Sequence, residues 1–231
     1  MKKLVITMML VCFCAPFIMA QDDYHKFEVY GGYSRDISKD PNLSITGAFN
    51  ARQAGNGLEK GFNGFNASAT FNFSKYLGIK ADLADHFSTG SIQAGVVTGN
   101  AGGTTKESRL NIQGGLQIKN NSKEARFKPF GHFLAGINRQ SVKIDNASQN
   151  VITVYGSDKI TSTGFAATFG GGLDIRVSKR IDIRAIQFNY TLNSVSAKTL
   201  AQSNGIGGPY IVAIEGKNQN QITFGFGVVF H

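Results

Sequence analysis

Apolar and polar residues alternate along this chain in a series of short segments, and the alternation is clearest in segment 65–73. Its apolar positions are Phe65, Ala67, Ala69, Phe71 and Phe73, and its polar positions are Asn66, Ser68, Thr70 and Asn72. Successive side chains of a β-strand point to opposite faces, so a period of two residues is typical of a strand. We therefore predict a strand with one apolar and one polar face.

Seven further segments show the same period, and each is predicted to be a strand. They cover residues 24–34, 77–87, 108–119, 128–144, 165–177, 181–190 and 219–231. The fifth strand of the series has an ambiguous register, because Phe130 and Leu134 are out of step with its other apolar residues. In the seventh, Phe188 and Tyr190 are out of step with the start of the strand, which indicates a β-bulge near Gln187.

The connections between these strands alternate in length. Long ones cover about 36–61, 88–107, 145–161 and 193–218, and shorter ones cover 74–76, 120–126 and 178–180. Antiparallel neighbours reverse direction at each connection, so the long connections all fall at one end and the short ones at the other. The glycine-rich stretches 99–103 and 205–208 are predicted to be loop tips within two of the long connections.

Eight amphipathic strands with this arrangement of connections suit a lipid bilayer. Strands that cross hydrocarbon must close into a barrel so that every backbone group is paired, with an apolar outer face and a polar lumen. The pattern predicts an all-β fold, an eight-stranded antiparallel transmembrane up-and-down β-barrel. The residues expected to face the membrane are Phe65, Phe71, Phe73, Leu110, Ile112, Leu116, Leu173, Ile175, Ile181, Ile183, Phe224, Phe226 and Phe230.

Charged residues occupy the opposite, polar faces of several strands. They are Lys26, Glu28, Lys80, Asp82, Arg109, Asp174, Arg176, Asp182 and Arg184. The lumen of an eight-stranded barrel is just wide enough for its own side chains, and a single charge buried there is costly unless it is paired. We predict a structural ion-pair network that fills the lumen, with a gated ion path as the alternative.

The amino terminus has the features of a secretory signal. Basic Lys2 and Lys3 precede an apolar run from Leu4 to Ile18 and a small residue at Ala20, so we expect a signal peptide over 1–20 and a barrel domain over 21–231. Both cysteines lie in the signal, so the exported chain has no disulfide and no thiolate site. Its net charge is 22 − 15 = +7. The basic residues do not cluster with stacking aromatics, so no nucleic-acid partner is expected.

Basic residues are concentrated in the short connections. They are Lys75, Lys119, Lys123, Arg126, Lys128, Lys179 and Arg180, with Glu124 as the only acid among them. The interpretation that we favour is that turns are solvated and therefore polar. The alternative is an attraction between this rim of the barrel and anionic phospholipid headgroups.

The remaining candidate chemistry is sparse. The four histidines, His25, His86, His132 and His231, lack metal-ligand spacing, so neither a metal nor another cofactor is expected. The sequence DHFS over 85–88 places His86 and Ser88 on one strand face and resembles part of the site of outer-membrane lipid A deacylases. A histidine-activated serine attacks esters, but the flanking residues match that family poorly and no acid partner is evident. We therefore expect no enzyme here.

Three stretches of the sequence resemble a known family. They are FEVYGGYS, FGGGLDIRVSKRIDIRAIQFNY and QITFGFGVVF, at 27–34, 169–190 and 221–230. Together they resemble the small outer-membrane β-barrel proteins that are similar to the transmembrane domain of outer-membrane protein A. The chain departs from that family's pattern in placing His231 after the aromatic Phe230, and we expect no peptidoglycan-binding domain.

The resemblance implies a place in the bacterial outer membrane of a Gram-negative-type cell, with outer-membrane lipids around the barrel. It implies delivery by periplasmic chaperones, insertion by the barrel-insertion machinery through the aromatic carboxyl-terminal signal, and a monomeric protein. We expect a filled lumen and four long surface loops with a structural, envelope-integrity or surface-interaction role, the surface ligand being unknown. The alternatives are a small-solute porin of low conductance, a deacylase-like esterase using His86 and Ser88, and a soluble exported β-barrel or sandwich.

Overall fold

The computed structural model describes residues 23–37, 43–47, 61–96, 99–145, 159–195, 198–204, 208–214 and 218–231. The expected signal peptide lies outside these residues. The described strands are β1 (Phe27–Asp36), β2 (Leu43–Gly47), β3 (Phe62–Asn72), β4 (Leu77–Val96), β5 (Gly99–Lys119), β6 (Phe127–Asp145), β7 (Lys159–Arg176), β8 (Ile181–Val195), β9 (Lys198–Asn204), β10 (Gly208–Ile214) and β11 (Asn218–Phe230). Among the described residues, no helix is long and apolar enough to cross a membrane.

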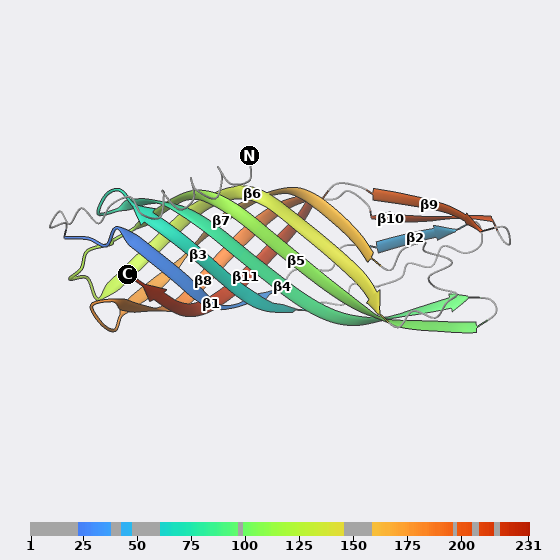
Figure 1. The fold of residues 1–231 in the computed structure, drawn as a ribbon, viewed down its shortest axis with the longest axis horizontal. Coiled ribbons are helices and arrows are strands. Elements are labelled where there is room, and N and C mark those ends of the chain that lie inside the picture. Colours follow the sequence, from blue (N-terminus) through green and yellow to red (C-terminus); the bar gives the residue numbers. More distant parts are fainter. Residues whose placement is uncertain are drawn as a thin grey trace, which may run out of the picture.

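Eight of these strands close into one antiparallel barrel in the order β1-β11-β8-β7-β6-β5-β4-β3 (Figure 1). The barrel closes where β1 pairs with β11, from Val29 opposite Phe230 to Asp36 opposite Thr223. Every strand of the ring therefore has a partner on both sides, which satisfies the backbone groups along its length. The predicted fold class and the count of eight barrel strands are confirmed.

The two faces of the barrel wall differ sharply in polarity. Along β3 the side chains alternate between buried and exposed, and its exposed positions include Phe65 and Phe71, which are 45 % and 44 % accessible. Large apolar side chains line the outer face of every barrel strand, and we call this surface the apolar belt. Polar and charged side chains fill the inside. This arrangement is the reverse of a soluble protein, so the soluble alternative does not fit the structure.

The predicted membrane-facing residues all lie on this outer face. Exposed are Phe65, Phe71, Phe73, Ile112, Leu116, Ile183, Phe224, Phe226 and Phe230, and partly exposed are Leu110, Leu173, Ile175 and Ile181. The apolar belt ends near Phe87 on β4 and Ile137 on β6, beyond which polar side chains such as Arg139 face outward.

The structure resolves the ambiguous register of β6. Its pairing with β5 and with β7 is unbroken, so no bulge shifts the alternation. Phe133 and Ile137 face outward, and Phe130 and Leu134 are buried inside the barrel, 7 % and 1 % exposed. The residues that broke the pattern are therefore apolar residues in a largely polar lumen.

The bulge expected near Gln187 is present, centred two residues earlier at Ala185. Leu173 of β7 lies opposite Ile186, whereas the next residue, Asp174, lies opposite Arg184. The extra residue in β8 shifts the alternation by one position. As a result Ile186 faces outward, 51 % exposed, and Gln187 faces the lumen, 2 % exposed.

The long connections contain more regular structure than the sequence indicated. Strands β4 and β5 pair continuously from Leu77 opposite Ile118 to Val96 opposite Gly99, so the expectation of a long loop over 88–107 was wrong, and stretch 99–103 belongs to β5. Strands β2, β10 and β9, which come from two other long connections, form a separate sheet, at the opposite end of Figure 1 from the carboxyl terminus. The second glycine-rich stretch lies outside the described residues except for Gly208.

Candidate functional site

The lumen holds a balanced set of charged side chains. Ten charged residues of the described chain are at most 7 % exposed. The cations are Lys80, Arg109, Lys119, Lys128 and Arg184, and the anions are Glu28, Asp36, Asp82, Asp174 and Asp182. Five positive and five negative charges leave this set with no net charge. Buried charges are tolerated when they are paired and hydrogen-bonded, so their contacts decide what the lumen can do.

Seven of the nine residues predicted for the lumen network belong to this set. The other two, Lys26 and Arg176, are only partly buried and lie at the short-turn end of the barrel. The sequence interpretation missed Asp36, and it placed Lys119 and Lys128 among the solvated turns. That placement was wrong, because the strands reach the edge of each turn and their alternation directs both ammonium groups inward.

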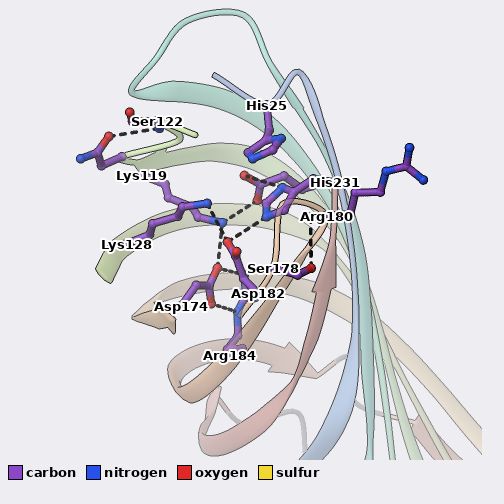
Figure 2. A network of polar contacts seen from close by, with 12 residues as sticks. His25, Lys119, Ser122, Lys128, Asp174, Ser178, Arg180, Asp182, Arg184 and His231 are labelled. Carbon is purple, nitrogen blue, oxygen red and sulfur yellow. Dashed lines mark hydrogen bonds and ion pairs between the residues drawn. The ribbon is translucent and has the colours of Figure 1, made fainter. Parts of the chain in front are cut away.

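A cluster of ion pairs fills the lumen near the short turns (Figure 2). Lys119 Nζ lies 2.8 Å from Glu28 Oε2 and 2.8 Å from Asp174 Oδ2. Lys128 Nζ donates a hydrogen bond to Asp182 Oδ2 at 2.8 Å. These contacts connect β1 with β5 and β7, and β6 with β8, so the cluster links strands across the lumen as well as neighbours in the wall.

Arg184 is the most heavily contacted cation of this cluster. Its Nε and Nη2 donate to the two carboxylate oxygens of Asp174 at 2.8 and 3.1 Å. Its guanidinium carbon lies 4.2 Å from the ring centre of Tyr30 and 4.1 Å from that of Phe130. Gly172 leaves room for the Phe130 ring, because a Cβ there would lie 2.9 Å from two ring atoms. A planar guanidinium suits both a bidentate pair and stacking on aromatic rings.

The middle of the lumen continues the network with fewer charges. Lys80 Nζ lies 3.1 Å from Asp82 Oδ1, and Asn66 donates to Asp82 Oδ2 at 2.8 Å. Neutral side chains follow, with hydrogen bonds of 2.7 to 3.3 Å among Gln113, Thr168, Thr191, Asn111, Asn138 and Gln221. These bonds cross between strands and fix the side chains in the centre of the barrel.

A third group closes the lumen toward the long connections. Arg109 Nη1 donates to Asp36 Oδ2 at 3.2 Å, and the guanidinium carbon of Arg109 lies 3.9 Å from the ring centre of the buried Phe62. Nearby, Ser34 Oγ and His86 Nε2 share a hydrogen bond of 2.8 Å. Contacts between side chains therefore extend through the barrel from one end to the other.

Residues 23–26 cross the barrel mouth at the short-turn end, and we call them the mouth strap. The backbone NH of His25 donates to the carbonyl of Asn121 at 3.2 Å, and that of Lys123 donates to the carbonyl of Asp23 at 3.0 Å. Four steps around the ring separate β1 from β6, in either direction, so the turn before β6 lies across the mouth from β1. The strap therefore spans the opening.

His25 of the strap packs on His231 at the end of the described chain (Figure 2). The two rings stack with their centres 3.9 Å apart. His231 Nε2 lies 2.8 Å from Asp182 Oδ2, which ties this stack to the cluster below. Burial, together with the neighbouring His231 and Lys128, lowers the pKa of His25 to about 3. His25 is therefore neutral at physiological pH.

The serine and histidine considered for ester hydrolysis do not form a catalytic arrangement. His86 faces the lumen, 2 % exposed, and its bond is to Ser34. Among the described residues, His86 Nδ1 has no hydrogen-bond partner, so no carboxylate orients the ring. The described residues also contain no group of three or more His, Cys, Asp or Glu side chains that could hold a metal ion.

The basic residues that remain at the short-turn end face solvent. Exposed there are Lys75, Lys123, Arg126, Lys179 and Arg180, together with Glu124. They surround the end of the barrel that the mouth strap covers. This position is compatible with both interpretations of the basic turns, solvated polar turns and an attraction for anionic headgroups.

Comparison with known proteins agrees with this architecture. A family model described as outer membrane protein beta-barrel domain matches residues 5–230. The solved structure of OprG from Pseudomonas aeruginosa is 16 % identical with a TM-score of 0.56, covering 90 % of this chain and 99 % of that one. Neisserial surface protein A is 11 % identical with a TM-score of 0.45, covering 90 % of this chain and 99 % of that one. Ail of Yersinia pestis is 14 % identical with a TM-score of 0.42, covering 88 % of this chain and 97 % of that one.

No curated protein sequence matches the chain significantly. At 16 % identity the OprG structure informs the fold alone, and the family follows from the match of the family model over nearly the whole chain. A closed antiparallel ring, an apolar outer surface and a polar interior, which this chain has, are features of outer-membrane barrels in general. The chain therefore belongs to the family of outer-membrane β-barrel proteins.

Proposed function

We propose that this protein is a non-conducting anchor in the bacterial outer membrane, which presents its long-loop end to the cell surface for interaction with other molecules. The observation that carries the proposal is the filled lumen. Five cations and five anions are buried there without net charge, and side-chain contacts run from the mouth strap to Arg109. An ion entering this space would have to displace bonded partners, which supports an anchor over a channel.

The lengths of the strands support a role at the surface. About ten tilted residues are enough for a strand to cross a bilayer. Strand β4 has 20 residues, and its pairing with β5 continues to Val96, well past the apolar residue Phe87 at the belt edge. A ribbon of this length extends beyond the hydrocarbon, and the sheet of β2, β10 and β9 adds further structure from the long connections.

Planar-bilayer recording of the refolded full-length protein tests the anchor. The wild type should give only small, intermittent current, because no continuous water path remains. A variant that removes two plug side chains, Lys119→Ala with Arg184→Ala, should conduct more steadily if it folds, as judged by heat-modifiable gel mobility. A large, steady, porin-sized conductance of the wild type would reject the filled lumen and with it the proposal.

A low-conductance path is the second candidate, and one observation favours it. The side-chain amides of Gln117 and Asn193 are buried in the lumen, and neither their oxygen nor their nitrogen atoms have hydrogen-bond partners among the described residues. Such groups suit water molecules, which bind where several polar atoms are available. Swelling of proteoliposomes in small neutral solutes distinguishes the two functions: swelling above that of empty liposomes supports a path, and equal rates support the anchor.

A further inference from the structure

Outward-facing cations gather just beyond the apolar belt on β5 and β6. Lys106, Arg139 and Lys143 are all exposed on the outer face of the barrel, and we call them the outer basic patch. Along β6 the outward positions run from the apolar Ile137, 51 % exposed, to Arg139 and on to Lys143. The patch therefore begins directly at the edge of the belt and continues away from it, on the long-loop side.

The strand register places like charges opposite each other in this patch. Lys106 of β5 is the direct partner of Lys143 of β6. Neighbouring strands lie about 4.8 Å apart, and like charges that face each other across a strand pair destabilise a sheet. Lys106 and Lys143 each also have an interaction with another part of the chain. The register therefore brings cationic side chains together on this part of the outer face.

Hydroxyl groups fill the space between the arginine and the lysine pair. Ser108, Ser141 and Thr161 are successive partners across β5, β6 and β7, and Ser141 Oγ lies 3.4 Å from Thr161 Oγ1. Asp85 also lies on this face, and its carboxylate accepts a hydrogen bond from Ser108 Oγ at 3.0 Å. Cations separated by hydroxyls suit a ligand that carries both phosphates and sugar hydroxyls.

We propose that the outer basic patch binds the phosphate groups of the phosphorylated glycolipid that forms the outer leaflet of the outer membrane. This inference rests on the proposed function, because it requires the long-loop end to face the cell surface. The Arg139 guanidinium makes a bidentate contact with a phosphate at the belt edge, and Lys106 and Lys143 bind a second anionic group farther out. The acyl chains of the same lipid lie along outward residues such as Ile137.

The position of the patch favours a lipid over a soluble polyanion. Leu110 lies opposite Arg139 on the neighbouring strand, so Arg139 is the direct cross-strand neighbour of an apolar residue of the belt. An amphipathic ligand contacts both surfaces at once, whereas a soluble anion contacts only the charged one. Cations next to a membrane each attract an anionic surface enough to change affinity about fivefold.

Titration of the full-length protein, refolded in detergent micelles, tests the proposal. The probes are purified lipid A, the same glycolipid after enzymatic removal of its phosphates, and phosphatidylglycerol, with bound lipid counted by native mass spectrometry. Lys106→Gln with Lys143→Gln should weaken lipid A binding about 25-fold, at about fivefold for each lysine. The control, Lys179→Gln with Arg180→Gln, removes the same charge at the short-turn end and should bind as the wild type does.

Equal binding by the double variant and the control would overturn the proposal, and so would equal binding of lipid A and its dephosphorylated form. Phosphatidylglycerol bound as tightly as lipid A would show a general anionic surface and would also overturn it. If the double variant does not fold, Arg139→Gln serves in its place and must bind lipid A more weakly. Binding in micelles does not depend on conductance or on orientation in the cell, so a failure here is separate from a failure of the proposed function.

Discussion

At the scale of single residues, Arg184 illustrates how this barrel manages a charge inside a membrane protein. Arg184 is 1 % exposed, and its guanidinium forms a bidentate pair with Asp174 and contacts the rings of Tyr30 and Phe130. Removing one member of a buried ion pair leaves the other charge buried without a partner, which lowers the free energy of unfolding by about 3 to 5 kcal/mol. Replacing both members by apolar groups is often nearly neutral. The pair therefore invites a double-mutant experiment.

We expect Arg184→Met to lower the free energy of unfolding by roughly 3 kcal/mol. The double variant Arg184→Met with Asp174→Leu should recover part of that loss. Recovery should be incomplete, because Asp174 also lies 2.8 Å from Lys119. Urea unfolding in lipid vesicles gives the free energies of unfolding. Because the sequence has no tryptophan, unfolding is followed by circular dichroism or gel mobility. Arg184→Lys serves as the control, because it keeps the positive charge but loses the bidentate hydrogen bonds to Asp174 and the stacking on the aromatic rings. A double variant less stable than Arg184→Met would contradict the pairing.

At the scale of elements, each barrel strand separates a lipid-facing set of side chains from a lumen-facing one, and β3 does so most cleanly. Ala69 is exposed on the outer face of β3, next to the buried Thr70. Across the wall, Ala69 lies opposite Val29 on one side and Ala81 on the other, in the middle of the apolar belt. A charge placed at this depth has neither water nor a partner near it.

Ala69→Arg is expected to destabilise the folded barrel by about 2 to 4 kcal/mol, the cost of an arginine near the bilayer midplane. Ser194→Arg, on the outer face of β8 opposite the uncharged Asn218, should cost only about 0 to 1 kcal/mol, because it lies near the interface. Thr70→Arg should impair folding through crowding of the lumen instead. Folding yields into vesicles provide the measurement, and normal insertion of the Ala69 variant would show that the two faces are assigned wrongly.

The mouth strap is the element whose stability should respond to pH. The pKa of His25 is lowered to about 3 in the folded protein, whereas an exposed histidine titrates near 6.5. Between these pH values the unfolded chain binds a proton at His25 that the folded barrel does not. The contribution of His25 to the free energy of unfolding is therefore complete above about pH 6.5 and falls as the pH drops toward 3.

We expect His25→Phe, which keeps the stack on His231 but does not titrate, to lose less stability than the wild type between pH 7.5 and pH 4.5. Thermal unfolding of both proteins at the two pH values gives the comparison. The carboxylates titrate in both proteins, so the difference between them isolates the contribution of His25. An identical loss in the two proteins would mean that His25 is not held neutral by the strap.

At the scale of the whole molecule, the two ends of the barrel have different architectures. One end has short turns, exposed cations such as Lys75 and the mouth strap, whereas the other continues into the β4–β5 ribbon and a separate sheet (Figure 1). In outer-membrane barrels short turns face the periplasm and long connections the outside. This asymmetry predicts an orientation.

Cysteine variants at the two ends should label differently on intact cells. Gln93→Cys, in the extended part of β4, should react with a membrane-impermeant maleimide, and Ser74→Cys, in the first short turn, should react only after the outer membrane is permeabilised. Both variants should label equally once the cells are broken, which controls for reactivity. Labelling of Ser74→Cys but not Gln93→Cys on intact cells would reverse the orientation.

The sequence by itself determined the number of barrel strands, their amphipathic faces and the bulge near Gln187, because alternation and its breaks are local properties of a strand. The tertiary structure alone decided which lumen groups meet. Lys119 was placed in a turn, yet it pairs with Glu28, 91 residues away, because closure of the ring brings β1 and β5 to face each other.

The same reason explains the mouth strap and the placement of Phe130. Residues 23–26 bind the turn before β6 only because the barrel puts that turn across the mouth, and no local pattern encodes the contact. Phe130 broke the alternation of its strand, and its role as a stacking surface for Arg184 became visible only with β8 in place. Contacts across a closed lumen depend on strand order and stagger, and period alone leaves these open.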